Sequence, residues 1–339
     1  MEKLMEISDS LLVAAAPPIA GLRFRGFRGE VDYPRMVAVV RDSLEADGQE
    51  WAVSEEDTAR DYRYLENCDP YTDMIFAEVA GEVAGYGRCW HEQLLDQTRI
   101  YSFFAHLRPA WREMGIRRAM LRYLEQRLGD IATDHPDDGA KLYQCWVAHG
   151  EKHWEALLQR EGYTAVRYGY QMVRPNLEDI PDLPLPPGLE LRPADLSQWR
   201  QIWEAVQEAF RDHWGARPQS ENNLVEWQAQ PTFNPALWQV AWDGDEVAGG
   251  VLTFIDHREN EEYGRLRGYT ETIFTRRPWR RRGLAHALIA RSLQVQKEQG
   301  MTESALGVDA ENLSGALNIY KSMGFQVIKR AATYRKAIR

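Results

Sequence analysis

A short segment at residues 275–285 constrains the fold of this chain more than any other feature. It reads Thr-Arg-Arg-Pro-Trp-Arg-Arg-Arg-Gly-Leu-Ala, comes after a β-branched, alternating run at 269–274, and leads into an apolar, helix-like pattern from Ala287. The amides of a helix's first turn have no intrahelical partners, and the helix dipole favours negative charge there. Gly283 and Ala285 keep large side chains away from this turn. The segment therefore predicts a strand, a tight turn and a helix whose N-terminus binds an anion.

The order of residues separates this loop from two other phosphate-binding loops. No Gly-Lys-Ser/Thr comes after the arginines, as a kinase-type phosphate loop requires, and the Gly-x-Gly-x-x-Gly order of dinucleotide-binding proteins is absent. An arginine cluster by itself also fits a solvated face or a nucleic-acid patch. The residues downstream of the loop decide between these alternatives.

A second motif lies downstream of the first. The run 304–308 has the composition of a strand, and after it Asn312, Ala316 and Tyr320 are spaced four residues apart, followed by Gly324 and Phe325. This spacing predicts one helix face that carries all three side chains, with Gly324 in the left-handed conformation at the helix C-terminus.

Together the two motifs resemble the GCN5-related N-acetyltransferases (GNAT), whose pyrophosphate loop has the spacing Arg280-x-x-Gly283-x-Ala285. The resemblance implies an α/β (α+β) fold, a mixed and mostly antiparallel sheet flanked by helices, and acetyl-CoA as co-substrate without a metal. It implies that Tyr320 protonates the departing thiolate, which a phenol can do because its pKa lies above that of a thiol. A core-lining aromatic is the other interpretation of Tyr320. The cofactor-binding residues that the resemblance implies are Phe274, Thr275, Arg280, Arg281, Arg282, Gly283, Leu284, Ala285, His286 and Asn312.

The resemblance leaves the general base and the acceptor site open. Glu271 is a candidate base on the strand and equally fits a solvent-facing or ion-paired residue, and Asp309 is the next candidate. The glutamate that some relatives carry in the second strand is Gly307 here, which counts against a peptide-N-terminus acetylase. His213 and Trp214 are candidate acceptor-binding residues; a helix-capping histidine and a core-packed tryptophan are the alternative.

The chain also contains one internal repeat. Gly21–Arg25 and the apolar positions after it have a counterpart at 188–210, and the hairpin pattern at 76–86 recurs at 239–250. A proline-rich linker at 175–187 separates the copies. We therefore expect two tandem GNAT domains, residues 1–178 and 179–339. This tandem layout is similar to the mycothiol synthase-like acetyltransferases, which acetylate a cysteinyl amine on a sugar conjugate; antibiotic or polyamine acetylation is equally compatible.

The first copy has lost several residues of the motifs. Its loop keeps Arg112 and Gly115, but Arg117 replaces the small Ala285 and Glu113 adds an acid. When Gly162–Tyr163 is matched to Gly324–Phe325, the positions of Asn312, Ala316 and Tyr320 become Gly150, Trp154 and Leu158. We expect the first copy to be structural and the second to be catalytic.

Composition limits the remaining possibilities. The 339 residues carry a net charge of −10, which disfavours nucleic acid as a partner. Cys68, Cys89 and Cys145 are few and widely spaced, which argues against a disulfide framework and a zinc site and indicates the cytoplasm. No segment has the length of a membrane span. We therefore expect a cytoplasmic N-acetyltransferase, monomeric or homodimeric, acting on a small-molecule amine. A catalytically silent acyl-CoA sensor or interaction protein of the same fold is the alternative.

Overall fold

The computed structural model describes residues 10–312 and 315–338, and these divide into two compact units. Unit 1 comprises Met1–Val166 with Ala332–Arg339, and unit 2 comprises Arg167–Ala331. Both boundaries fall inside strands, β6 (Thr164–Arg174) and β13 (Gln326–Ala337). This division differs from the expected 1–178 and 179–339. Strand pairing causes the difference. The end of β13 pairs with β5 of unit 1, whereas β6 pairs with β12 of unit 2.

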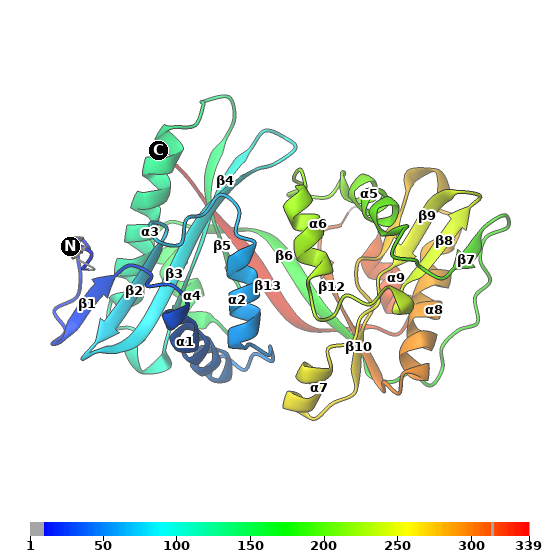
Figure 1. Cartoon of the computed structure of the whole chain (residues 1–339), viewed down its shortest axis with the longest axis horizontal. Helices are drawn as coiled ribbons and strands as arrows, with labels where there is room; N and C mark the ends of the chain where they lie inside the picture. The colour runs from blue at the N-terminus through cyan, green and yellow to red at the C-terminus, as the bar shows by residue number, and fades with distance from the viewer. Residues whose placement is uncertain (1–9, 313–314, 339) are drawn as a thin grey trace, which may run out of the picture. The chain divides into compact units, whose positions relative to one another are not determined.

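Unit 1 is a mostly antiparallel sheet in the order β1-β2-β3-β4-β5-β13, with one parallel pair, β4 and β5 (Figure 1). Its strands are β1 (Leu22–Arg25), β2 (Met74–Val79), β3 (Glu82–Gln93), β4 (Arg99–Leu107), β5 (Lys141–Val147) and the end of β13. Its helices are α1 (Tyr33–Ala46), α2 (Glu55–Arg63), α3 (Ile116–Thr133) and α4 (Lys152–Arg160). The expected hairpin turn lies at Ala80 and Gly81, both with positive φ.

Along the chain, the helices and strands of unit 2 follow the same order as those of unit 1, with α7 in addition. The order β11-β9-β8-β7 forms one sheet, from β7 (Glu190–Arg192), β8 (Gln239–Asp243), β9 (Glu246–Val251) and β11 (Phe274–Thr275). A second group of strands has the order β6-β12-β10, from β6, β10 (Arg267–Tyr269) and β12 (Glu303–Asp309). Its helices are α5 (Trp199–Phe210), α6 (Glu221–Gln228), α7 (His257–Tyr263), α8 (Leu284–Glu298) and α9 (Ala316–Ser322). Residues 175–187 between β6 and β7 are not helical, as their prolines predict.

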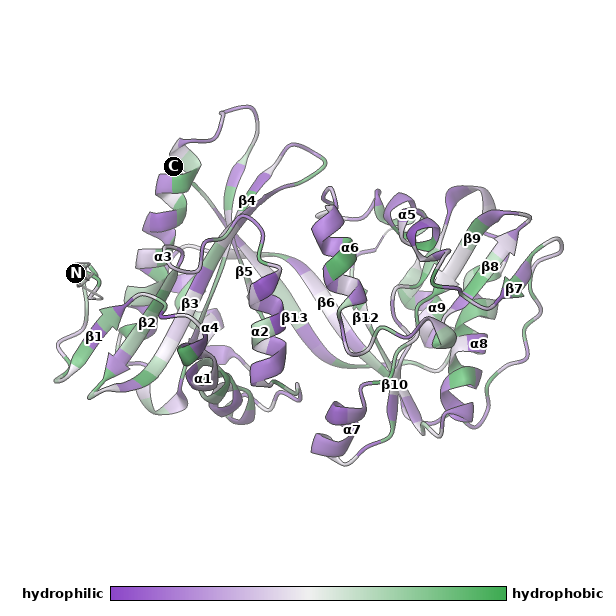
Figure 2. Ribbon diagram, viewed as in Figure 1, coloured by the Kyte–Doolittle hydropathy of each residue, from purple (hydrophilic) through white to green (hydrophobic). Residues whose placement is uncertain are grey.

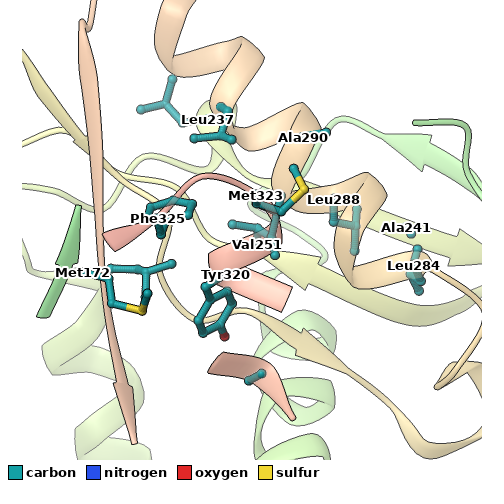
Figure 3. Close-up of a cluster of buried hydrophobic side chains, with 14 of the residues drawn as sticks. Met172, Leu237, Ala241, Val251, Leu284, Leu288, Ala290, Tyr320, Met323 and Phe325 are labelled. Carbon is teal, nitrogen blue, oxygen red and sulfur yellow. The ribbon is translucent and has the colours of Figure 1, made fainter. Parts of the chain in front are cut away.

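The core of unit 2 packs α8 and α9 against the strands. Leu284, Leu288 and Leu293 of α8 are fully buried, and they cluster with Ala241 and Val251 of the neighbouring hairpin (Figure 3). The alternation of hydrophobic and hydrophilic residues along the strands is visible in Figure 2. None of the described helices is both long and apolar enough to span a bilayer.

The strand expected at 269–275 is interrupted, so that prediction was wrong in detail. β10 ends at Tyr269, β11 begins at Phe274, and Thr272 between them has φ 46°. A β-branched residue at positive φ is a backbone outlier that persists only where the surrounding structure holds it. The reason is a one-residue bulge: Tyr269 and Glu271 bond to Phe254 and Leu252, and the register shifts by one residue before Phe274 pairs with Gly250.

Candidate active site

The loop at 275–285 has the strand, tight turn and helix that its sequence predicts. A 3₁₀ turn at Arg277–Trp279 comes after β11, Arg281 and Gly283 have positive φ (62° and 86°), and α8 begins at Leu284. The first intrahelical hydrogen bond runs from the Ala287 amide to the Gly283 carbonyl (3.2 Å). No acidic residue lies in the first turn of α8, and no side chain caps it. A Cβ built at Gly283 meets no atom within 4 Å, so the approach to these amides is open.

The three arginines of the loop have different environments. The Arg280 guanidinium donates to the carbonyls of Thr275 (3.0 Å) and Ala209 (3.1 Å), and lies 3.7 Å from Asp212. It therefore ties the loop to the end of α5. Arg281 and Arg282 are exposed and form no ion pair within the described ranges, which leaves two cations for a bound anion.

Two strands diverge next to this loop. β10 pairs in parallel with β12 as far as Tyr269 and Ala305, and the Thr270 amide donates to the Ala305 carbonyl (2.9 Å). Beyond this point only the pairing on the other side continues: the Leu252 amide donates to the Glu271 carbonyl (3.0 Å), and Phe274 pairs with Gly250. Backbone groups of β11 and β12 that would pair in a continuous sheet are thereby separated. The opening between them is where the pantetheine arm of acetyl-CoA would lie if the resemblance extends to this site.

Glu271 occupies the start of this opening. Its carboxylate accepts a hydrogen bond from the Gly307 amide (2.6 Å), and the Thr272 amide is a second donor. The side chain remains partly exposed. Burial of the carboxyl group outweighs both amide donors and raises the pKa of Glu271 to about 7. A carboxyl group with this pKa exchanges a proton near neutral pH, as a general base must.

Tyr320 lies on α9 and is 7% exposed. Its ring packs near Phe325, and its hydroxyl oxygen points away from Met323 and Phe325 (Figure 3). Burial and the negative charge of Glu271 raise the pKa of Tyr320 above that of an ordinary phenol. The hydroxyl has no hydrogen-bond partner among residues 10–312 and 315–338. Tyr320 and Glu271 are therefore electrostatic neighbours, and the phenol keeps its proton at neutral pH.

Asn312 lies outside the helix on which the spacing placed it. α9 begins at Ala316 after Gly315, and the Asn312 amide donates to the Asp309 carbonyl (3.2 Å) in a turn after β12. The prediction of one face with Asn312, Ala316 and Tyr320 was wrong for Asn312 because Gly315, at φ 74°, starts the helix late. Ala316 and Tyr320 are both buried in α9, and Gly324 has the predicted positive φ, 85°.

The remaining candidates gather at the end of β12. The carboxylate of Asp309 accepts two hydrogen bonds from Arg167 (2.8 and 2.6 Å), and the Arg167 guanidinium lies 5.5 Å from the ring of Trp214. His213 packs on Phe210 (4.4 Å between centroids), and burial lowers its pKa while the charge of Asp309 opposes this shift. Trp214 is 40% exposed, so it is not the core residue of the alternative interpretation. Sequence reasoning missed Arg167, because nothing near it in the sequence marks it.

The same loop backbone recurs in unit 1 with different side chains. Glu113 and Gly115 have φ 66° and 85°, and α3 begins directly after them. Arg117, in the first turn, is 9% exposed and donates to the Ala105 carbonyl (2.6 Å). Its guanidinium lies 4.1 Å from the ring of Trp154 and 3.4 Å from the carboxylate of Glu151. In unit 1, Arg117 and Trp154 thus lie where β4 and β5 separate.

Comparison with known proteins agrees with this geometry. The Acetyltransferase (GNAT) family profile matches residues 199–325. The chain is 27% identical over 308 residues to a mycothiol acetyltransferase of Geodermatophilus obscurus, covering 89% of this chain and 93% of the relative. A crystal structure of a GCN5-related N-acetyltransferase from Sphaerobacter thermophilus superimposes with a TM-score of 0.73 at 26% identity, over 94% of this chain and 96% of that one.

Residues 199–325 of the chain thus match the GNAT acetyltransferase family. A tandem GNAT protein from the clavulanic acid biosynthesis pathway shares the fold, with a TM-score of 0.62 at 14% identity over 94% of this chain and 99% of that one. The fold class expected from the sequence, a tandem arrangement of mixed sheets flanked by helices, is confirmed, and the protein is an acyltransferase. In the described residues, no group of three or more histidine, cysteine or acidic side chains is arranged to hold a metal ion.

Proposed function

We propose that unit 2 transfers the acetyl group of acetyl-CoA to a primary amine of a small molecule. The observation that carries this proposal is the convergence of three features in one unit: the uncapped helix N-terminus at Gly283, the opening after Thr270, and the Glu271–Tyr320 pair beside it. Each feature serves one part of acetyl-CoA or of the reaction. The first copy lacks the Glu271 and Tyr320 side chains, and Arg117 lies where β4 and β5 separate.

The residues of unit 2 divide the chemistry among them. Amides at the start of α8, with Arg281 and Arg282, would bind the pyrophosphate, while Arg280 holds the loop in place. Backbone groups around Phe274 and Thr275 would hold the pantetheine and polarise the acetyl carbonyl. Glu271 accepts a proton from the acceptor amine as its nitrogen attacks the carbonyl carbon. The C–S bond then breaks, and the Tyr320 hydroxyl gives its proton to the departing sulfur.

We assign Asp309 to acceptor binding and not to the role of general base for which the sequence made it a candidate. Its carboxylate accepts two hydrogen bonds from the Arg167 guanidinium. We assign Arg167, His213 and Trp214 to acceptor binding as well. Relatives named mycothiol acetyltransferases support an acceptor of that kind. The resemblance seen in the sequence implies that such an acceptor is a cysteinyl amine on a sugar conjugate.

A turnover assay with a panel of amines tests this proposal. The panel contains a cysteinyl glycoside, a polyamine and an aminoglycoside, each with acetyl-CoA, and mass spectrometry detects the acetylated product. Product detection is preferable to thiol detection because a cysteinyl acceptor carries a thiol of its own. Acetylation of at least one amine, lost in Tyr320→Phe, is the expected result. Binding of CoA without turnover of any amine would instead support a silent acyl-CoA-binding protein.

A further inference from the structure

A cationic side chain of unit 1 lies among aromatic rings without an acidic partner. Arg88 is half-buried on β3, opposite Phe104 of β4. Its guanidinium carbon lies 5.1 Å from the ring centre of Tyr62, 5.5 Å from that of Trp90 and 5.3 Å from that of Phe104. In the part of the chain that the structure describes, this guanidinium forms no ion pair with any carboxylate. Cation–π contacts hold it, but they leave its in-plane donors unused.

Two polar atoms at this place are buried and form no hydrogen bond of good geometry, although Arg88 and Tyr62 lie close enough to interact. They are the Nε of Arg88 and the hydroxyl oxygen of Tyr62, from β3 and α2 respectively. Buried polar atoms in folded proteins nearly always have partners, so each exception requires an explanation. The two terminal nitrogens of Arg88 are not among the buried atoms, and the rings of Trp90 and Phe104 are partly exposed. A ligand can therefore reach the guanidinium between these rings.

Charges of both signs surround the cluster, and Glu92 accepts a hydrogen bond from the Trp90 indole (3.3 Å). His106 lies on the same face of the sheet, opposite Tyr86, and burial lowers its pKa to about 3. The charges that act on it, those of Arg117 and Arg88, are both positive. Asp61 of α2 is the acid whose pKa Arg88 affects, yet burial raises the pKa of Asp61 and it forms no ion pair with Arg88. Cys68 is kept neutral because burial raises its pKa to about 12.

We propose that unit 1 binds a small carboxylate ligand at Arg88, with the flat apolar body of the ligand against Trp90 and Phe104. A guanidinium presents two parallel donors whose spacing matches a carboxylate. Partly exposed aromatic rings favour a flat apolar group over a strongly hydrated dianion such as phosphate. None of these residues belongs to the site of acetyl transfer, so the proposal does not depend on that activity.

Calorimetry on the full chain, without CoA, tests this site with benzoate as the probe. Benzamide is the neutral control of the same shape, and inorganic phosphate is the anion without an apolar body. We expect benzoate to bind with a dissociation constant on the order of 1 mM, since few heavy atoms are in contact. Arg88→Met should weaken binding by about 10- to 100-fold, the range for hydrogen bonds to a charged group.

Arg118→Met is the matched control variant, because Arg118 is an exposed arginine of the same unit that already pairs with Glu161. It should leave benzoate binding unchanged. Equal binding of benzoate and benzamide, unchanged binding in Arg88→Met, or tighter binding of phosphate than of benzoate would each overturn the proposal. If Arg88→Met does not fold, Arg88→Lys decides: it keeps the charge and loses the paired donors, so unchanged benzoate binding would overturn the proposal equally.

Discussion

Glu271 and Tyr320 are neighbours whose surroundings shift their protonation in ways that suit opposite tasks. Burial brings the pKa of the carboxyl group to about 7, and it moves the pKa of the phenol further above the pKa of a thiol. One group can therefore accept a proton near neutral pH while the other retains its proton until a thiolate forms. Pairs of titratable groups separated in this way commonly divide the base and acid roles.

Tyr320→Phe tests the acid directly. The substitution keeps the ring that packs near Phe325 and removes a hydroxyl that has no hydrogen-bond partner in the described part of the chain. We expect the turnover number to fall by about 10²- to 10⁴-fold, the range for a positioned acid or base, with little change in CoA affinity. Steady-state kinetics and CoA calorimetry on the same preparation measure the two quantities. A variant with wild-type turnover on its true acceptor would assign Tyr320 to packing alone.

Glu271→Gln tests the base through the pH dependence of the rate. Below pH 7 the wild-type carboxyl group is increasingly protonated and cannot accept a proton, so the rate should rise with pH through about 7. The glutamine variant should lose this dependence while its amide oxygen can still accept the bond from Gly307. Asp309→Asn is the control carboxylate, and it should keep the wild-type pH profile. If both variants keep that profile, no protein carboxylate acts as the base.

The same carboxyl group links stability to pH with a defined sign. Burial raises the pKa of Glu271 from the ordinary 4.5 to about 7, so the folded state favours the neutral form. Its favourable contribution is complete below pH 4.5 and is lost as the pH rises through about 7. We therefore expect Glu271→Gln to raise the melting temperature relative to wild type more at pH 8 than at pH 4.5. An equal difference at both pH values would contradict the assigned pKa shift.

At the scale of elements, the Gly283 turn decides whether α8 presents free amides. Gly283→Val places a β-branched residue at φ 86°, which strains the turn and covers the amides, so CoA binding should be lost. Gly115→Val is the matched control, since Gly115 has φ 85° in the equivalent loop of unit 1. The control should lower the melting temperature to a similar extent and leave CoA affinity unchanged. Loss of CoA binding in both variants would indicate a general effect of strain.

The sequence was a good guide to elements wherever spacing and glycine placement carried the information. The strand–loop–helix order around Gly283, the hairpins at 76–86 and 239–250 and the left-handed Gly324 were all predictable, because each depends on neighbouring residues. The split of the strand at Thr272 was not, since β-branched residues there predict a continuous strand. The bulge there depends on how this strand pairs with a distant segment, residues 249–254.

Side-chain partners distant in the sequence were the hardest feature of the site to predict. The ion pair between Arg167 and Asp309 joins residues 142 positions apart in the sequence. No local sequence pattern predicts it. The raised pKa of Glu271 likewise depends on burial that only the folded chain creates. For these reasons the sequence left Glu271 and Asp309 as alternative bases, whereas their surroundings in the structure distinguish them.

At the scale of the whole molecule, two copies of one architecture have diverged in the residues beside the same loop. In unit 2 the position after Gly283 and Leu284 is the small Ala285, whereas the equivalent residue of unit 1 is Arg117, held by Ala105, Glu151 and Trp154. Displacing this arginine would break its hydrogen bond to the Ala105 carbonyl and its ion pair with Glu151. Unit 1 therefore keeps the loop backbone, while Arg117 occupies the place next to it.

We therefore expect one tight CoA site per chain, and calorimetry with CoA should give a stoichiometry near one. Replacing Arg281 and Arg282 together by alanine should weaken binding, because both are exposed cations without an ion pair in the described residues. Arg112→Ala should leave binding unchanged: in unit 1 this side chain pairs with Asp47 through two hydrogen bonds of 2.7 Å and faces no open anion site. Two equally tight sites, or a single site lost in Arg112→Ala and retained in the double variant, would place the cofactor in unit 1. If CoA bound in unit 1, Arg117 would have to leave its place beside Trp154. The fall in melting temperature of the Arg117→Ala variant, measured without CoA, shows how much Arg117 stabilises the fold in that place.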